Sequence, residues 1–80
     1  MNIDPLLLDR ARTRPQSIAF AEALQLCRQL GYQKVRHVRG HRILHHPARG
    51  VLSMQEGLRG RAKVYQVRRL VPAARGRSGA

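Results

Sequence analysis

The strongest constraint on the fold is an alternation of apolar and basic residues between Gly31 and Pro47, a stretch that contains all four histidines. The alternation runs from Gln33 to Val38 and resumes from His41 to His46, and Arg39-Gly40 interrupts it. A period of two with a short glycine-containing interruption is typical of a β-hairpin. The sequence therefore predicts a hairpin that displays imidazoles among arginines.

Two helices are expected before the hairpin. The first is predicted from Asp4 to Arg12, with its first residue as a possible N-cap and a proline at the first helical position. Pro15 breaks the helical pattern, Ser17 is the expected cap of the second helix, and Gly31 is its expected stop. The spacing assigns the core face of the second helix to Phe20, Ala23, Leu24, Cys27 and Leu30, and its solvent face to Glu22, Gln25 and Arg28 or Gln29.

The chain after the hairpin predicts a third strand and a last helix. Residues 47–50 form a second turn, Val51 to Gln55 form a short strand, and residues 57–61 form a flexible basic loop. Apolar residues recur with helical spacing from Ala62 to Val71, and Pro72 is expected to end this helix. Residues 72–80 contain no large apolar side chain, so they are predicted to be a disordered basic tail.

This order of elements predicts one α+β domain over residues 1–71, with the order α-α-β-β-β-α and a three-stranded antiparallel sheet. A chain of 80 residues is small. Domains near this size bury only about 60% of their unfolded surface. The core must therefore be built from few large side chains.

The charge of the chain indicates a polyanionic partner. Sixteen Lys and Arg against four acidic residues give a net charge of +12, spread along the whole chain. Nucleic acid is favoured over a membrane, because no apolar run approaches the roughly 20 residues that span a bilayer. Residues 1–5 lack the basic start and apolar core of a signal peptide, so we expect a cytoplasmic protein. The single cysteine, Cys27, excludes an internal disulfide and is expected to be a small buried hydrophobe.

The scarcity of acidic residues argues against one class of enzymes. Nucleases that use two metal ions need several converging carboxylates, and the only candidates here are Asp4, Asp9, Glu22 and Glu56. A zinc site at His37, His45 and His46 is not expected, because no cysteine or carboxylate lies among them. We therefore expect neither a metal nor a cofactor.

Three segments of the chain resemble the HicA-type toxins of bacterial toxin–antitoxin pairs. Arg14-Pro15-Gln16-Ser17-Ile18-Ala19-Phe20, followed by a helix into Leu30-Gly31-Tyr32, resembles the amino-terminal part of that family. Arg39-Gly40-His41-Arg42-Ile43-Leu44-His45-His46-Pro47 resembles the family's Gly-Ser-His-Arg-Ile…His-Pro strand. The most specific segment is Leu52-Ser53-Met54-Gln55 with Gly60 to Arg68, which is similar to Leu-Asn-Leu-Gln…Gly-Lys-Ala-Lys-Pro-Tyr-Gln-Val in a subgroup. Together the segments cover about residues 14–71.

The resemblance implies a fold like a double-stranded-RNA-binding domain, with the helices packed on one face of the sheet. It also implies metal-independent cleavage of mRNA and a HicB-type protein antitoxin that blocks the site. The catalytic residue that it carries over is His41. Such a reaction needs a base for the 2′-hydroxyl proton or an acid for the leaving 5′-oxygen, and imidazole titrates closest to neutral pH. Adjacent Arg39 and Arg42 are expected to flank His41 and to stabilise the charge of the transition state.

The sequence leaves open which face of the sheet His41 occupies. Strict alternation places it on the same side as Ile43, which is expected to be buried. Either the strand begins at Arg42, or Gly40 allows a local twist that turns His41 outward.

Basic side chains from the hairpin onward are the candidate RNA contacts, because Lys and Arg displace counterions from phosphates. They are Arg36, Arg39, Arg42, Arg49, Arg59, Arg61, Lys63 and Arg68, with Arg69 beside them. Tyr65 is either a base-stacking residue or a half-buried member of the helix.

Two other functions stay open. The first is a catalytically silent RNA-binding module of the same fold, since Arg39-Gly40-His41 stands where the family has Gly-Ser-His. The second is a ribosome-associated structural protein, which the small size and the charge of +12 also fit. The free protein is expected to be a monomer.

Overall fold

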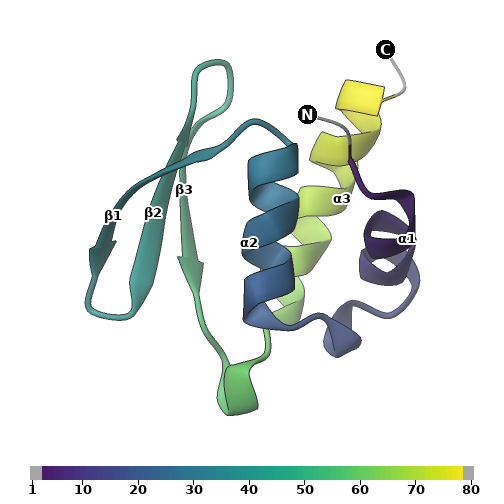
Figure 1. Ribbon diagram of the computed structural model, residues 1–80, viewed down its shortest axis with the longest axis horizontal. Helices are drawn as coiled ribbons and strands as arrows, with labels where there is room; N and C mark the ends of the chain where they lie inside the picture. Colours follow the sequence, from purple (N-terminus) through teal and green to yellow (C-terminus); the bar gives the residue numbers. More distant parts are fainter. Residues whose placement is uncertain (1–2, 79–80) are drawn as a thin grey trace.

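The computed structural model describes residues 3–78 and follows the predicted order of elements (Figure 1). The helices are α1 (Pro5–Thr13), α2 (Phe20–Gln29) and α3 (Val64–Ser78), and the strands are β1 (Gln33–Val38), β2 (His41–His46) and β3 (Gly50–Gln55). Two short 3-10 turns, η1 (Pro15–Ser17) and η2 (Leu58–Gly60), precede α2 and α3. The predicted α+β fold is confirmed, with an antiparallel sheet in the order β1-β2-β3. Among residues 3–78, no helix is both long and apolar enough to span a membrane.

All three helices lie on one side of the sheet, as predicted (Figure 1). α2 and α3 are next to the strands, and α1 packs on these two helices from the side away from the sheet. Leu44 and Met54 are the sheet's part of the core, at 1% and 0% exposure. The helices, with Leu30 at the C-cap of α2, supply most of the rest: Leu7, Ala11, Phe20, Ala23, Leu26, Cys27, Leu30, Val67 and Leu70. We call the side of the sheet toward the helices the inner face and the other side the outer face.

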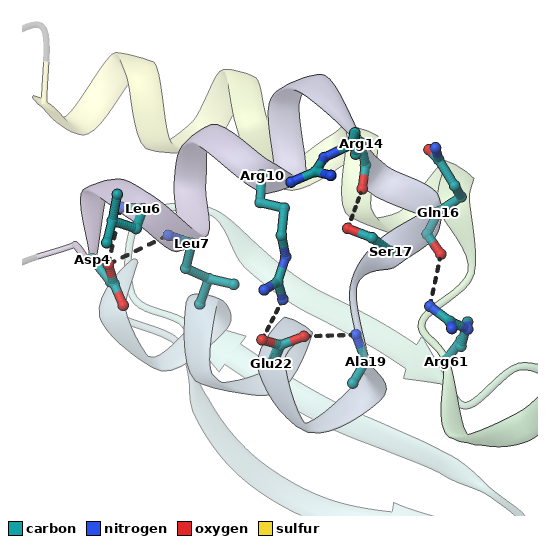
Figure 2. A network of polar contacts seen from close by, with 10 residues as sticks. All are labelled: Asp4, Leu6, Leu7, Arg10, Arg14, Gln16, Ser17, Ala19, Glu22 and Arg61. Carbon is teal, nitrogen blue, oxygen red and sulfur yellow. Dashed lines mark hydrogen bonds and ion pairs between the residues drawn. The ribbon is translucent and has the colours of Figure 1, made fainter.

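The N-terminus of α1 is capped as predicted. The Asp4 carboxylate accepts hydrogen bonds from the backbone N–H groups of Leu6 (3.0 Å) and Leu7 (3.3 Å) (Figure 2). The N–H of Asp4 itself donates to Oε1 of Gln29 in α2 (2.9 Å). Asp4 therefore caps α1 and also connects it by a hydrogen bond to the end of α2. Losing such a cap lowers the free energy of unfolding by about 1 kcal/mol.

The prediction that Ser17 caps the second helix is wrong. Its hydroxyl donates to the carbonyl of Arg14 (2.8 Å) within η1, and α2 begins only at Phe20. The intervening residues are extended, because the carbonyl of Ile18 accepts from the N–H of Ala62 (2.9 Å) in the chain leading to α3. Because of this long-range pairing, α2 begins at Phe20 and not directly after Ser17. At the start of α2, the Glu22 carboxylate accepts a hydrogen bond from the N–H of Ala19 (3.0 Å) and forms an ion pair with Arg10 (Figure 2).

The buried stripe of α2 is broader than the sequence predicts. Leu26, absent from the expected core face, is fully buried, whereas Leu24 is only half-buried. Gln29 is buried as well, with its side chain bonded to α1. The reason is that α2 lies between the sheet and the other helices, so more than one side of it is covered. Gly31, at φ 102°, ends the helix as predicted.

The prediction that Pro72 ends the last helix is wrong, since α3 continues to Ser78. A proline inside a helix removes one hydrogen bond and disfavours the helical conformation of the preceding residue, at a cost of about 3 kcal/mol. Here the preceding residues are Leu70, which is buried, and Val71, which packs against the core, so packing holds this turn helical. Of the tail predicted to be disordered, the backbone of residues 72–78 belongs to α3, and residues 79–80 lie outside the described part of the chain.

Candidate active site

The hairpin turn sets the register of the candidate site. Arg39 (φ 48°) and Gly40 (φ 81°) both have positive φ, the backbone of the two-residue turn whose twist matches that of the flanking strands. Glycine adopts this conformation without strain, and a Cβ at Gly40 would meet nothing within 4 Å. The turn pairs Val38 with His41 and His37 with Arg42, so His41 is the first residue of β2.

The faces of β2 answer the question that the sequence left open. Leu44 is buried on the inner face, whereas Ile43 is only half-buried, so the expectation that Ile43 belongs to the core is wrong. Because neighbouring residues of a strand point to opposite faces, His41 shares the outer face with Ile43 and His45. The strand includes His41, and regular alternation alone brings it outward.

The imidazole of His41 meets polar side chains from β3. Its Nδ1 lies 3.1 Å from the Ser53 hydroxyl oxygen, and Gln55 stands directly opposite in the sheet. The Gln55 side-chain oxygen accepts a hydrogen bond from Nζ of Lys63 (2.9 Å), just before α3. An imidazole, a hydroxyl and an ammonium group are therefore assembled at one end of the sheet from three separate segments.

Gln66 fixes this assembly from the side. It is buried in α3, and its amide donates to the carbonyl of Ser53 (3.2 Å) and accepts from the N–H of Gln55 (3.1 Å). The Ser53 carbonyl and the Gln55 N–H point away from β2, on the free edge of β3. The Gln66 amide therefore forms with them the hydrogen bonds that a neighbouring strand would form. The only sequence signal for this role was its place in the third HicA-like segment. Tyr65, largely exposed, has its hydroxyl 3.4 Å from the Gln66 amide nitrogen.

The structure gathers about half of the predicted RNA contacts near His41. The pairing of His41 with Gln55 places the start of β2 beside the end of β3, from which the chain enters η2. The turn between β1 and β2 and the η2 segment consequently lie at the same end of the molecule (Figure 1). Arg39, Arg59, Arg61 and Lys63 belong to this end, and Arg36 is on the outer face opposite Ile43. Arg49, in the turn after β2, and Arg68 and Arg69, on α3, are elsewhere.

The prediction that Arg42 flanks His41 is wrong. Arg42 is on the inner face, where its Nη1 donates to Nε2 of His37 (2.6 Å). Its guanidinium carbon is 5.5 Å from the centroid of the Phe20 ring. Consecutive residues of a strand point to opposite faces, so adjacency to His41 in sequence means separation in space.

The other two histidines of β2 differ from each other. His45 is exposed on the outer face, but His46 is buried at 8% exposure and is therefore not a solvated side chain that could contact phosphate. Nδ1 of His46 accepts from the N–H groups of Ala48 (2.9 Å) and Arg49 (3.1 Å), and its ring is 5.1 Å from that of Tyr32. His46 therefore shapes the turn that follows β2. Within residues 3–78, no three His, Cys, Asp or Glu side chains are grouped as metal ligands.

The shifted titratable groups lie in the helices. The N–H of Ala19 and then the guanidinium of Arg10 lower the pKa of the Glu22 carboxyl. Burial raises the pKa of the Cys27 thiol to about 12, so this thiol is protonated and unreactive at neutral pH, as its predicted core position requires. In the described part of the chain the ion pairs are Arg10–Glu22, between α1 and α2, and Arg12–Asp9, within α1.

No protein-family model, curated protein or solved structure matches this chain. A function is therefore inferred from the geometry at His41 and from the segments that resemble HicA-type toxins.

Proposed function

We propose that the protein is a metal-independent endoribonuclease that cleaves mRNA, the toxin of a HicA/HicB-type pair, with His41 as its general acid or base. The observation that carries the proposal is the placement of His41 on the uncovered outer face, oriented by Ser53 and next to the Lys63–Gln55 pair. Its supports are the net charge of +12 and the resemblance of three segments to that family.

The reaction is an attack of the RNA 2′-hydroxyl on the adjacent phosphorus, which forms a P–O2′ bond and breaks the P–O5′ bond. The base removes the 2′-hydroxyl proton, and the acid protonates the departing 5′-oxygen. Nε2 of His41 is the nitrogen available to RNA, because Nδ1 is 3.1 Å from the Ser53 hydroxyl. If Nδ1 donates to that hydroxyl, Nε2 has the lone pair of a base; if the hydroxyl donates instead, Nε2 has the proton of an acid. A rotatable hydroxyl thus suits either role.

Lys63 supplies positive charge for the transition state. A pentacoordinate phosphorus has more negative charge on its oxygens than the substrate phosphate, and a fixed cation stabilises the difference. The hydrogen bond from Nζ to Gln55 holds Lys63 beside the residue that pairs with His41. In this proposal Arg39 and Arg61 bind the neighbouring phosphates.

The second candidate is a catalytically silent RNA-binding module. It is favoured by Arg39-Gly40-His41, in which the hydroxyl residue before the histidine is missing. In this protein a hydroxyl reaches the histidine from the neighbouring strand, through Ser53, which supports the catalytic alternative.

A cleavage assay with a chelator separates these functions. Purified protein should cleave a 5′-labelled RNA equally well with and without EDTA, and His41→Ala should abolish cleavage. The matched control is His45→Ala, since His45 is exposed on the same face of the same strand. Cleavage that EDTA abolishes and magnesium restores would contradict the mechanism, and wild-type protein that is inert on RNA would favour the silent module.

The biological side of the proposal concerns a cytoplasmic toxin and its inhibitor. Expression of the wild-type chain should arrest growth, and co-expression of a HicB-type antitoxin from a neighbouring gene should relieve the arrest. The uncovered outer face is the surface that such an antitoxin must block. Growth arrest by His41→Ala equal to that by the wild type would contradict this assignment.

A further inference from the structure

A second group of basic side chains lies on the inner face of the hairpin, on the side opposite to His41. Lys34 pairs with Leu44 and His37 pairs with Arg42, so all three polar residues share the face of the buried Leu44. Lys34 and His37 are nevertheless exposed, because β1 is an edge strand exposed along its whole length. We call Lys34, His37 and Arg42 the inner cluster.

Arg42 is restrained within the inner cluster at two points. Its Nη1 donates to Nε2 of His37 (2.6 Å), and its guanidinium lies over the ring of Phe20 at 5.5 Å. Because Nε2 accepts this bond, the neutral His37 ring has its proton on Nδ1, which is a further donor. A guanidinium has five N–H donors in a rigid plane, so most of those on Arg42 are available to a ligand in a fixed orientation.

Among residues 3–78, no carboxylate neutralises the inner cluster. Within residues 3–78, Glu22 pairs with Arg10 and Asp9 pairs with Arg12, and no carboxylate contacts Arg42. The Asp4 carboxylate is occupied as the cap of α1. Three basic or donor side chains without a carboxylate, one of them oriented from two sides, form a site for an external anion.

We propose that the inner cluster binds a phosphate of the RNA strand that His41 cleaves, and that this strand crosses the Arg39-Gly40 turn from the outer to the inner face. The proposal deepens the proposed function, since it rests on RNA as the ligand. His41 and Arg42 are consecutive but on opposite faces, and exposed Arg39 lies at the edge between them. A single strand is flexible enough to turn around this edge, whereas a duplex is stiff over many base pairs. The substrate class is therefore single-stranded RNA.

Binding of a non-cleavable RNA tests the contact at Arg42. A 2′-O-methyl oligonucleotide lacks the attacking hydroxyl, so its affinity is measured by fluorescence anisotropy without cleavage. Arg42→Gln should weaken binding about five- to tenfold at 0.1 M salt and lower the salt slope by about one, the effect of one lost phosphate contact. The charge-matched control is Arg12→Gln, on α1, which should change affinity less than about twofold. Equal affinities of the two variants would overturn the proposal.

Photo-cross-linking tests the path of the strand and does not depend on the folding of Arg42→Gln. Cys27 is fully buried, so a thiol-reactive photo-cross-linker is directed to an introduced cysteine. His37→Cys should cross-link the single strand and not a duplex of the same sequence. Leu6→Cys, at an exposed position of α1, should cross-link neither. Absence of a cross-link from His37→Cys, or an equal one from Leu6→Cys, would overturn the proposed path.

Steady-state kinetics and binding of poly-glutamate show whether a negative result contradicts the RNA contact at Arg42 or the proposed ribonuclease function. On cleavable RNA, Arg42→Gln should raise KM with kcat unchanged, whereas His41→Ala should lower kcat with affinity unchanged. If the wild type cleaves nothing, the proposed function fails, while the binding and cross-linking results still decide the inner cluster. Poly-glutamate binding that depends on Arg42 as strongly as RNA binding does would indicate an acidic protein as the ligand and would overturn the assignment to RNA.

Discussion

The two ends of β2 each carry a histidine, and the two residues have opposite surroundings. At the start, His41 is on the outer face, which no described helix covers (Figure 1), and its Nδ1 lies 3.1 Å from the Ser53 hydroxyl oxygen. At the end, His46 is on the inner face, buried at 8% exposure, with two backbone N–H groups donating to its Nδ1. The five-residue separation in a strand puts them on opposite faces. The same side chain is therefore available for chemistry at one end and part of the folded framework at the other.

The largest expected effect separates the two histidines by activity. His41→Ala should lower kcat for RNA cleavage by about 10² to 10⁴, because in the proposed function it removes the general acid or base, and it should leave the melting temperature nearly unchanged. A sharp fall in the melting temperature of His41→Ala would show that the residue points into the core. Circular dichroism melts and the cleavage assay on the same preparation measure both quantities.

The next effect separates them by stability. His46→Ala should reduce the free energy of unfolding by about 1–3 kcal/mol, since two backbone donors lose their acceptor and a ring packed on Tyr32 is removed. In a domain of this size each kcal/mol lowers the melting temperature by about 4–8 °C. Activity per folded molecule should persist. A His46→Ala variant that melts like the wild type but cannot cleave RNA would reverse the comparison.

A smaller effect on kcat tests whether Ser53 positions the imidazole of His41. Ser53→Ala should lower kcat by about tenfold and change the pH profile of kcat, because the imidazole loses the group that orients it. Ser53→Thr keeps the hydroxyl and should restore most of the activity. If Ser53→Ala and Ser53→Thr share the wild-type rate and profile, Ser53 does not position His41.

The smallest effect concerns acid and tests whether the Glu22 carboxylate contributes to stability below about pH 5. The pKa of Glu22 is lowered in the folded state by the N–H of Ala19 and by Arg10. Its contribution is therefore present above the unfolded pKa and is lost as pH falls through the folded value. About a third of this side chain is exposed, so solvent screening makes the contribution small. Glu22→Gln should flatten the decline of the melting temperature between pH 6 and 3; an unchanged slope would assign the acid sensitivity to other groups.

The elements that were predicted correctly depend on neighbours in the chain. The turn at Arg39-Gly40, the stop at Gly31 and the cap at Asp4 each follow from the backbone preference or hydrogen-bonding capacity of one or two residues. Such local signals determine where elements begin and how two strands of a hairpin pair. They left open whether the second strand begins at His41 or at Arg42, and the pairing of Val38 with His41 in the folded sheet decides for His41.

The tertiary structure decided the direction of the side chains and the helix boundaries. Ile43 and Leu44 are adjacent and both apolar, so the strand offers two possible core faces, and the position of the helices selects Leu44. That selection turns His41 outward and Arg42 inward at once. In the same way, the hydrogen bond between Ile18 and Ala62 delays the start of α2.

Gln66 shows most clearly what sequence alone does not contain. Its amide pairs with the backbone of Ser53 and Gln55, 13 and 11 residues earlier in the chain. Nothing in the helical spacing of residues 62–71 predicts a polar side chain that faces the sheet. The reason for one lies in β3, whose edge has backbone groups at Ser53 and Gln55 that need hydrogen-bond partners. The residue types and their order determined which chemistry is possible, and the packing of helices on one face determined which of those residues meet.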